Sequence, residues 1–190
     1  LSFLLCLAPA LHLARHKFPG KALVEGLLLA PALAPAMTFS MGVHFFFVKT
    51  GLADTFTGVV LVLTTFSYPF MLRALVAGYQ SFGPEYSLCA RNLGAGFFRR
   101  LILVDLPLLL PAAIAGGSVV FLIAFSEYFL VFLIGGGAVP SFTGFLFPFL
   151  NSSDRAVSSA LTLVFLIVPI GLFFLVELAV TRRYRARGMY

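Results

Sequence analysis

Long uninterrupted stretches of apolar residues constrain this chain more than any other feature of its sequence. Of its 190 residues, 61% are hydrophobic and only 11% are charged, whereas soluble domains average about 25% charged residues. Because the apolar runs are continuous and do not alternate with polar residues, they predict membrane-spanning helices. We therefore expect an all-α polytopic membrane protein. The five segments that carry this prediction are residues 1–14, 23–48, 56–76, 101–134 and 157–180.

The first and fourth segments differ in length from a single span. Residues 1–14 are fewer than the roughly 20 that a spanning helix needs, so we expect an N-terminally truncated chain. A signal peptide is the alternative, but no basic segment precedes this run. The fourth segment is too long for a hydrocarbon core of about 30 Å. We expect it to begin outside the membrane, near Asp105 and Pro107, and to cross at 112–133.

Basic residues between the segments predict the orientation of the chain. Eleven of the 13 lysines and arginines lie on one side of the predicted spans, and only Lys49 and Arg155 lie on the other. Since cytoplasmic loops are enriched in Lys and Arg, this bias places residues 83–107 and the C-terminus in the cytoplasm. Five spans then leave the N-terminus outside, which agrees with a six-helix parent that has one more crossing. The eleven are Arg15, Lys17, Lys21, Arg73, Arg91, Arg99, Arg100, Arg182, Arg183, Arg185 and Arg187.

A polar segment at 83–107 interrupts the apolar pattern and predicts two short helices joined by a glycine. Pro84 suits the start of a helix, and Glu85 suits the positive end of its dipole. We expect a helix at 86–93, a left-handed C-terminal cap at Gly94, and a second short helix from Phe97 to about Leu103. In this arrangement, Leu88, Cys89 and Leu93 are available to enter a groove, while Arg91 offers its guanidinium to a carboxylate or a carbonyl.

The stretch CARNLGAGFFRRLILVDLPLLLP resembles the conserved cytoplasmic loop of ABC importer permeases, the family of binding-protein-dependent inner-membrane components. Ala90 matches the second alanine of the family motif, Gly94 its glycine, and Leu106-Pro107 its closing pair. Leu88 stands in place of the motif's glutamate, and Cys89 in place of its first alanine. The resemblance implies that residues 84–100 form the loop that couples the permease to its ATPase. The coupling residues implied are Glu85, Leu88, Cys89, Ala90, Arg91, Leu93, Gly94 and Pro107.

The resemblance covers nearly the whole chain. HKFPGKALVEGLLLAPALAPAMTFSMG is similar to the helix after the first cytoplasmic loop of these permeases. AFSEYFLVFLIGGGAVPSFTGFLFPFL resembles the branch that serves thiamine, iron and polyamines. Residues 1–190 are then one transmembrane permease domain of a bacterial inner-membrane importer. Its implied partners are ATP-binding subunits, a second permease subunit of the same or a different kind, and an extracytoplasmic solute-binding protein. No cofactor is implied.

Two alternatives to an importer permease come from other classes. A secondary transporter working without ATP needs ligands for a coupling ion and preferably an internal repeat; we find no repeat, and the cytoplasmic loop would have no purpose. A membrane enzyme is disfavoured because HExxH, GxSxG and paired intramembrane acids are absent from the sequence. The chain also lacks GxxxxGK[ST], so any nucleotide site belongs to another polypeptide.

Two polar residues within apolar segments are candidates for a solute pathway. Glu127 lies deepest along the fourth segment, where a carboxylate would suit a cationic solute; a packing hydrogen bond or a position near the outer surface is the alternative. His44 is a second pathway candidate, with a packing role as its alternative. His12 and His16 are four residues apart, but no carboxylate or cysteine accompanies them, so no metal site is predicted.

Overall fold

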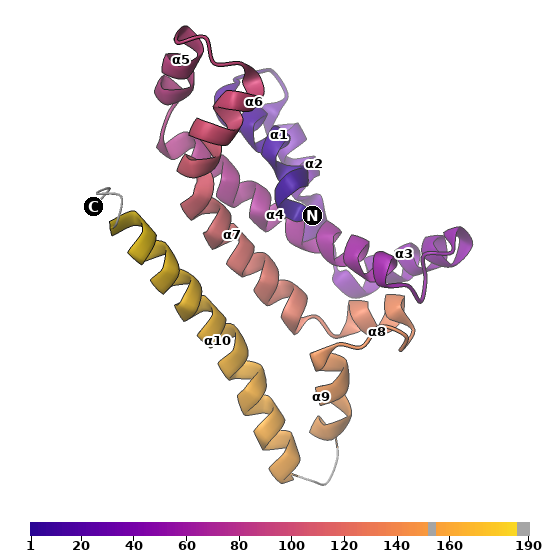
Figure 1. Cartoon of the computed structure of the whole chain (residues 1–190). Helices are drawn as coiled ribbons and strands as arrows, with labels where there is room; N and C mark the ends of the chain where they lie inside the picture. Colours follow the sequence, from indigo (N-terminus) through magenta and orange to yellow (C-terminus); the bar gives the residue numbers. More distant parts are fainter. Residues whose placement is uncertain (152–154, 186–190) are drawn as a thin grey trace. The chain divides into compact units, whose positions relative to one another are not determined.

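The computed structural model describes residues 1–151 and 155–185, and every regular element in these ranges is a helix (Figure 1). All five predicted apolar segments are helical, although their boundaries differ from those expected. In chain order the elements are α1 (Ser2–Arg15), α2 (Lys21–Leu33), α3 (Ala36–Thr50), α4 (Phe56–Ser81), α5 (Glu85–Asn92), α6 (Phe97–Arg100), the π-helical turn η1 (Leu101–Asp105), α7 (Leu106–Ser126), α8 (Phe129–Gly135), α9 (Phe142–Leu150) and α10 (Arg155–Arg185).

Three helical stretches within the described residues are long and apolar enough to cross a membrane. They are Phe56–Ser81, Phe97–Ser126 and Arg155–Val176, and a fourth is reached if the broken pair α2 and α3 counts as one span. Helix α1 is apolar but has only 14 residues. The predicted class, a polytopic helical membrane protein, is confirmed.

The second predicted segment is not one continuous helix. Helix α2 ends at Leu33, and Ala34 is extended, with φ −70° and ψ 135°, before α3 begins at Ala36. Pro35 explains the break, because a proline ring disfavours the helical conformation of the residue before it. The sequence shows this proline, but helical prolines are common enough in membrane spans that its presence alone does not predict a break.

The fourth predicted segment is placed wrongly in both its start and its end. Helix continues from Phe97 to Ser126 without interruption, so the short second helix expected at 97–103 is the beginning of a long one. The long helix then ends at Ser126, and α8 begins at Phe129, so 112–133 is not a single helix. The turn η1 keeps the long helix continuous: Leu106 donates its N–H to the carbonyl of Leu101, one residue wider than an α-helical bond.

Contacts divide the chain into two compact units. The first comprises Leu1–Ala34 and Thr64–Val120. Its core is formed by one face of α1, with Cys6, Ala10 and Leu13 at helical spacing, packed with residues of α4 and α7. Polar bonds support this packing: the thiol of Cys6 donates to the carbonyl of Tyr68, and the hydroxyl of Tyr68 donates to the carbonyl of Leu28. The α4 and α7 residues of the core are Met71, Leu72, Leu75, Tyr79 and Leu109.

Small residues let α4 and α7 approach closely inside the first unit. A Cβ atom at Gly116 would lie 2.7 Å from the Cβ of Ala74, and one at Gly78 would lie 2.6 Å from the Cβ of Ala112. Neither distance is possible between real side-chain carbons, so both positions require glycine. Close approach at small residues of this kind is common where membrane helices pack.

The second unit comprises Pro35–Leu63 and Phe121–Tyr190. The backbone N–H of Asp54 donates to the carbonyl of Ile134 at the end of α8, over 2.8 Å. Helix α9 lies within the loop at 135–153 that follows α8, and the hydroxyl of Ser141 caps it by accepting from the N–H of Gly144. Residues 152–153 of that loop and Arg187 of the basic tail lie outside the described residues.

Candidate functional site

Helix α5 and the start of the long helix form the predicted coupling segment, within the first unit. Pro84 precedes α5, and Glu85 occupies its first turn, as expected. Gly83 has a positive φ of +62°, and a Cβ atom there would lie 2.0 Å from a carboxylate oxygen of Glu85. Glycine at this position therefore permits both the turn that leaves α4 and the folding of the Glu85 carboxylate over it.

The end of α5 is fixed by a left-handed glycine, as the sequence predicts. Gly94 has a φ of +81°. Its N–H donates to the carbonyl of Arg91 over 3.0 Å, and the N–H of Ala95 donates to the carbonyl of Ala90 over 3.0 Å. This pair of bonds is a Schellman motif, which satisfies the last carbonyls of a helix and turns the chain sharply. The bent shape of the segment thus has a specific backbone cause.

A buried carboxylate joins α5 to the long helix. The hydroxyl of Ser87 donates to Oδ1 of Asp105 over 2.7 Å, and Nε of Arg100 lies 3.7 Å from Oδ2. The side chain of Asp105 is only 1% exposed. Because a buried carboxylate without partners is costly, both contacts stabilise the position of Asp105. Ser87 of α5 and Arg100 of α6 therefore both contact Asp105 of η1.

The turn η1 brings Asp105 into this position. Pro107 lies in the first turn of α7 and has no N–H to donate to the carbonyl four residues earlier. A wider turn before a proline accommodates the ring and the missing donor without ending the helix. The predicted coupling residue Pro107 therefore shapes the segment from within the long helix.

One face of α5 is apolar and open to the surroundings. Tyr86, Cys89 and Leu93 follow one another at intervals of three and four residues, so they share a face. Tyr86 is 57% exposed, Leu93 is 86% exposed, and Cys89 is also exposed. Phe98, just beyond the glycine turn, is 75% exposed. Exposed apolar residues grouped in this way mark a contact surface, of a partner or of lipid.

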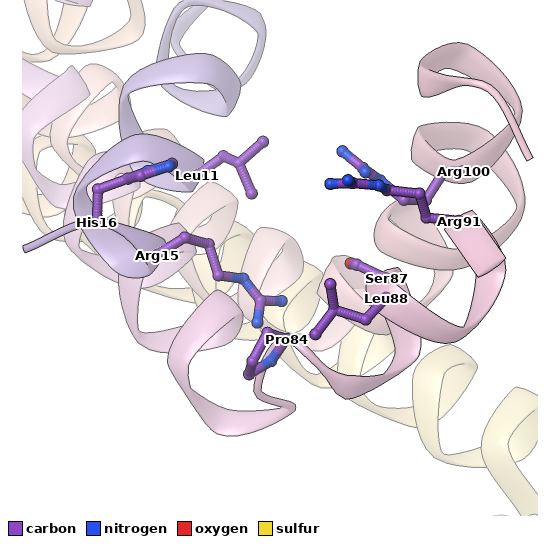
Figure 2. A pocket seen from close by; sticks show the side chains of 8 residues that line it. All are labelled: Leu11, Arg15, His16, Pro84, Ser87, Leu88, Arg91 and Arg100. Carbon is purple, nitrogen blue, oxygen red and sulfur yellow. The ribbon is translucent and has the colours of Figure 1, made fainter.

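Leu88 and Arg91 do not belong to that face. Together with Ser87 they line a cavity of about 200 Å³ that also contacts the C-terminal end of α1 (Figure 2). Arg15 and Arg100 extend into the same cavity. The structure therefore divides the predicted coupling residues into two groups, an outer apolar face with Cys89 and Leu93 and an inner basic cavity with Leu88 and Arg91.

Sequence reasoning missed Ser87, Asp105 and Arg15 as members of this site. Asp105 was expected only to mark the approach of a span. Its signal in the sequence is an acid five residues after Arg100 within an apolar run, a position that requires a polar partner. Ser87 and Arg15 carry no comparable local signal, because their roles depend on contacts across the fold.

The two pathway candidates lie in the second unit. A carboxylate oxygen of Glu127 accepts from the N–H of Leu130 over 3.2 Å, and the hydroxyl of Thr143 donates to its backbone carbonyl. Glu127 thus caps the start of α8 at the break after α7. Nδ1 of His44 is buried with no hydrogen-bond partner. Among the described residues, no hydrogen bond or ion pair joins Glu127 to His44.

His12 and His16 stack their rings, with centroids 4.6 Å apart, at the C-terminal end of α1. In the part of the chain that the structure describes, no group of three or more His, Cys, Asp or Glu side chains is placed to hold a metal ion. The cysteines are also separate: Cys6 is buried in the core of the first unit, and Cys89 is exposed on α5.

These features define a polytopic helical membrane protein that carries a short exposed helix between two of its long apolar helices. Residues 7–185 match the family described as "Binding-protein-dependent transport system inner membrane component". Because the match extends over nearly the whole chain, the protein belongs to this family. The resemblance seen in the motif around Gly94 is thereby confirmed.

Several characterised permeases are similar to the chain. A sulfate transport system permease protein of Escherichia coli K12 is 28% identical over 136 residues, which are 65% of this chain and 49% of that protein. A spermidine/putrescine permease protein of Haemophilus influenzae is 24% identical over 174 residues, 92% of this chain and 67% of that protein. A thiamine permease protein of Brucella suis is 28% identical over 153 residues, which are 71% of this chain and 27% of that protein. The chain spans about half the length of the sulfate permease.

The contact between Ser87 and Asp105 leads to a testable prediction. In Ser87→Ala, α5 loses a hydrogen bond to a charged group, worth about 1.5 kcal/mol or more. We expect backbone amides of residues 85–92 to exchange with deuterium about tenfold faster in the membrane-embedded protein, because local opening becomes easier.

Ser81→Ala is the matched control, since the Ser81 hydroxyl donates only to the Gly78 carbonyl of its own helix. Its exchange at residues 85–92 should equal that of the wild type. Unchanged exchange in Ser87→Ala would show that Asp105 does not hold α5.

Proposed function

We propose that the chain is the membrane-spanning permease part of an ATP-driven solute importer, with α5 as the element that contacts a separate ATPase subunit. The observation that carries this proposal is the exposed apolar face of α5, formed by Tyr86, Cys89 and Leu93, on a helix fixed at both ends. Family membership supports the class of transporter. A solute-binding protein and a second permease subunit complete the proposed assembly.

A rigid connection between α5 and the membrane is what such a role requires. The Schellman motif at Gly94 fixes the angle between α5 and α6, and Asp105 ties α5 to the long helix through Ser87. Since the helix is continuous from Phe97 to Ser126, a displacement of α5 is carried directly into an apolar helix. Closure of the partner ATPase on ATP binding would then alter access to the solute pathway.

The proposed orientation places α5 and the C-terminus in the cytoplasm. Support comes from the positive-inside bias of the sequence, eleven basic residues against two. A secondary transporter is less well supported, because neither its coupling-ion site nor its internal repeat is visible in the sequence. It would also leave the capped and exposed α5 without a partner.

The solute is left open by the relatives. Their names include sulfate, an anion, and spermidine/putrescine, which are cations. We propose Glu127 and His44 as pathway residues, with Glu127 selecting a cationic solute such as a polyamine or thiamine. Glu127 also caps α8, so a substitution there must separate the loss of charge from the loss of the cap.

Substitution of Gly94 tests the coupling role. Among the described residues, no atom lies within 4 Å of a Cβ atom built at Gly94. A larger residue there would therefore cause backbone strain, because φ is +81°, but no steric clash at its Cβ. A non-glycine residue in the left-handed conformation costs about 1–2 kcal/mol. This cost favours a different backbone conformation at residue 94, in which the hydrogen bonds of the Schellman motif are lost. We expect Gly94→Arg to abolish co-purification with the ATPase subunit while the protein still inserts into the membrane.

Gly94→Asn is the matched control, because asparagine tolerates the left-handed conformation. It should retain most of the associated ATPase. A normal amount of ATPase with Gly94→Arg would contradict the proposed contact.

The lone exposed thiol of Cys89 tests the orientation. A membrane-impermeant maleimide should label Cys89 in inside-out vesicles but not in right-side-out vesicles, and bound ATPase should reduce the labelling severalfold. Cys6 is buried, so Cys89→Ser should remove the signal. Labelling from the exterior would contradict the entire scheme.

Glu127→Gln tests the pathway role, since glutamine keeps an acceptor for the Leu130 N–H but loses the charge. For a cationic solute we expect a roughly tenfold higher KM for uptake by the assembled transporter, equivalent to about 1.4 kcal/mol. Glu127→Ala, which removes both charge and cap, should in addition lower stability. Uptake kinetics equal to the wild type in Glu127→Gln would leave Glu127 with the capping role alone.

A further inference from the structure

Two adjoining cavities of opposite chemistry lie beside α1 in the first unit. The basic cavity, of about 200 Å³, is the one lined by Arg15, Arg91 and Arg100 (Figure 2). The apolar cavity, of about 400 Å³, follows one face of α1 and also contacts Tyr79, Phe97 and Leu101. Leu11 and His16 line both. The two cavities therefore meet at the C-terminal end of α1.

The basic cavity contains cationic donors that the described residues do not satisfy. Both terminal nitrogens of Arg15 are buried and have no hydrogen-bond partner. The guanidinium lies over the rings of Tyr79, at 5.9 Å, and Phe82, at 5.2 Å. These ring contacts attract the charge but do not replace hydrogen bonds to its N–H groups. An acceptor in the cavity would satisfy them.

Figure 2 shows the arginines entering the cavity from different elements. Arg15 extends from α1 toward α5, and Arg91 and Arg100 extend back toward the end of α1. In the described part of the chain, Arg91 forms no ion pair. The site thus presents three guanidinium groups from three helices, which is the arrangement that favours a phosphate group.

Two carboxylates lie near the basic cavity, and that of Asp105 is already engaged. Asp105 is buried, with one oxygen accepting from Ser87 and the other facing Arg100. The carboxylate of Glu85 lies over Gly83 at the start of α5. Two acids therefore face three arginines, and positive charge remains in excess at the cavity.

The apolar cavity has the form needed for an acyl chain. Leu4, Leu7, Ala8 and Leu11 line it at intervals of one helical turn along α1. Leu4, at the far end of this lining, is 69% exposed. A chain lying along this face would end with its polar group at His16 and the basic cavity.

We propose that the two cavities together bind one anionic phospholipid, with its phosphate among Arg15, Arg91 and Arg100 and an acyl chain along α1. The proposal rests on the orientation in the proposed function, which places this end of α1 at the cytoplasmic leaflet, where anionic lipids and basic pockets meet. The lipid would lie between α1 and the inner side of α5. Lipid composition would then influence how firmly α5 is held.

The test measures lipid binding to the complete permease assembled with its ATPase. Spin-labelled phosphatidylglycerol should bind at least tenfold more tightly than spin-labelled phosphatidylcholine. In Arg15→Gln the affinity for phosphatidylglycerol should fall about fivefold, since each basic residue near an anionic lipid contributes about that factor. Arg99→Gln, an exposed neighbour outside the cavity, should bind like the wild type.

The apolar cavity is tested separately by Ala8→Phe, which fills it from an exposed position without replacing a core residue. It should reduce lipid binding, whereas Leu5→Phe, at a position outside the lining, should not. Soluble glycerol phosphate should compete only weakly. Arg15→Lys retains the charge and should keep most of the lipid selectivity, which shows that any loss in Arg15→Gln is not misfolding.

Four outcomes would overturn the proposal. Equal affinity for the two lipids, or wild-type affinity in Arg15→Gln, would remove the basic cavity as a lipid site. Tight binding of glycerol phosphate that Ala8→Phe leaves unchanged would assign the cavity to a soluble anion. Loss of the lipid when the ATPase binds would show that a protein subunit covers the site. ATPase association, measured on the same samples, tests the proposed function independently.

Discussion

The carboxylate of Asp105, almost fully removed from solvent, accepts a hydrogen bond from Ser87 and faces Arg100. A charge in such a position is stable only while its partners stay in place. This group and the Schellman motif at Gly94 together hold α5 in its position relative to the long helix. Without it, the exposed face of Tyr86, Cys89 and Leu93 would be carried on a helix held only by its two glycine turns. The proposed coupling to an ATPase needs the firmer attachment.

Part of this arrangement could be predicted from the sequence because its causes are local. The helix predicted at 86–93, and found at Glu85–Asn92, follows from Pro84 and Glu85. Its sharp end follows from Gly94, whose conformation few other residues adopt. The apolar segments follow from composition in the same way. Membership in the permease family was also visible in the motif, although Leu88 and Cys89 depart from it.

The remaining features could not be predicted for one of two reasons. Either they depend on contacts between residues distant in the sequence, or the local sequence is compatible with more than one conformation. Ser87 meets Asp105 across 18 residues, and Arg15 reaches its cavity from another helix. The break before Pro35 and the continuity of helix before Pro107 show the same residue type with opposite outcomes. A wider turn accommodates Pro107 within the helix, whereas the chain before Pro35 becomes extended. A proline disfavours helix in the residue before it, but its presence alone does not distinguish the two outcomes.

The turn η1 has a mechanical consequence of its own. It contains one residue more than the α-helical repeat requires, between Leu101 and Leu106. If that surplus were removed by a return to α-helical bonding, the turns of α7 that follow would rotate by about 100° about their axis. In that case, a displacement of α5 would be accompanied by a rotation of the apolar helix that follows it.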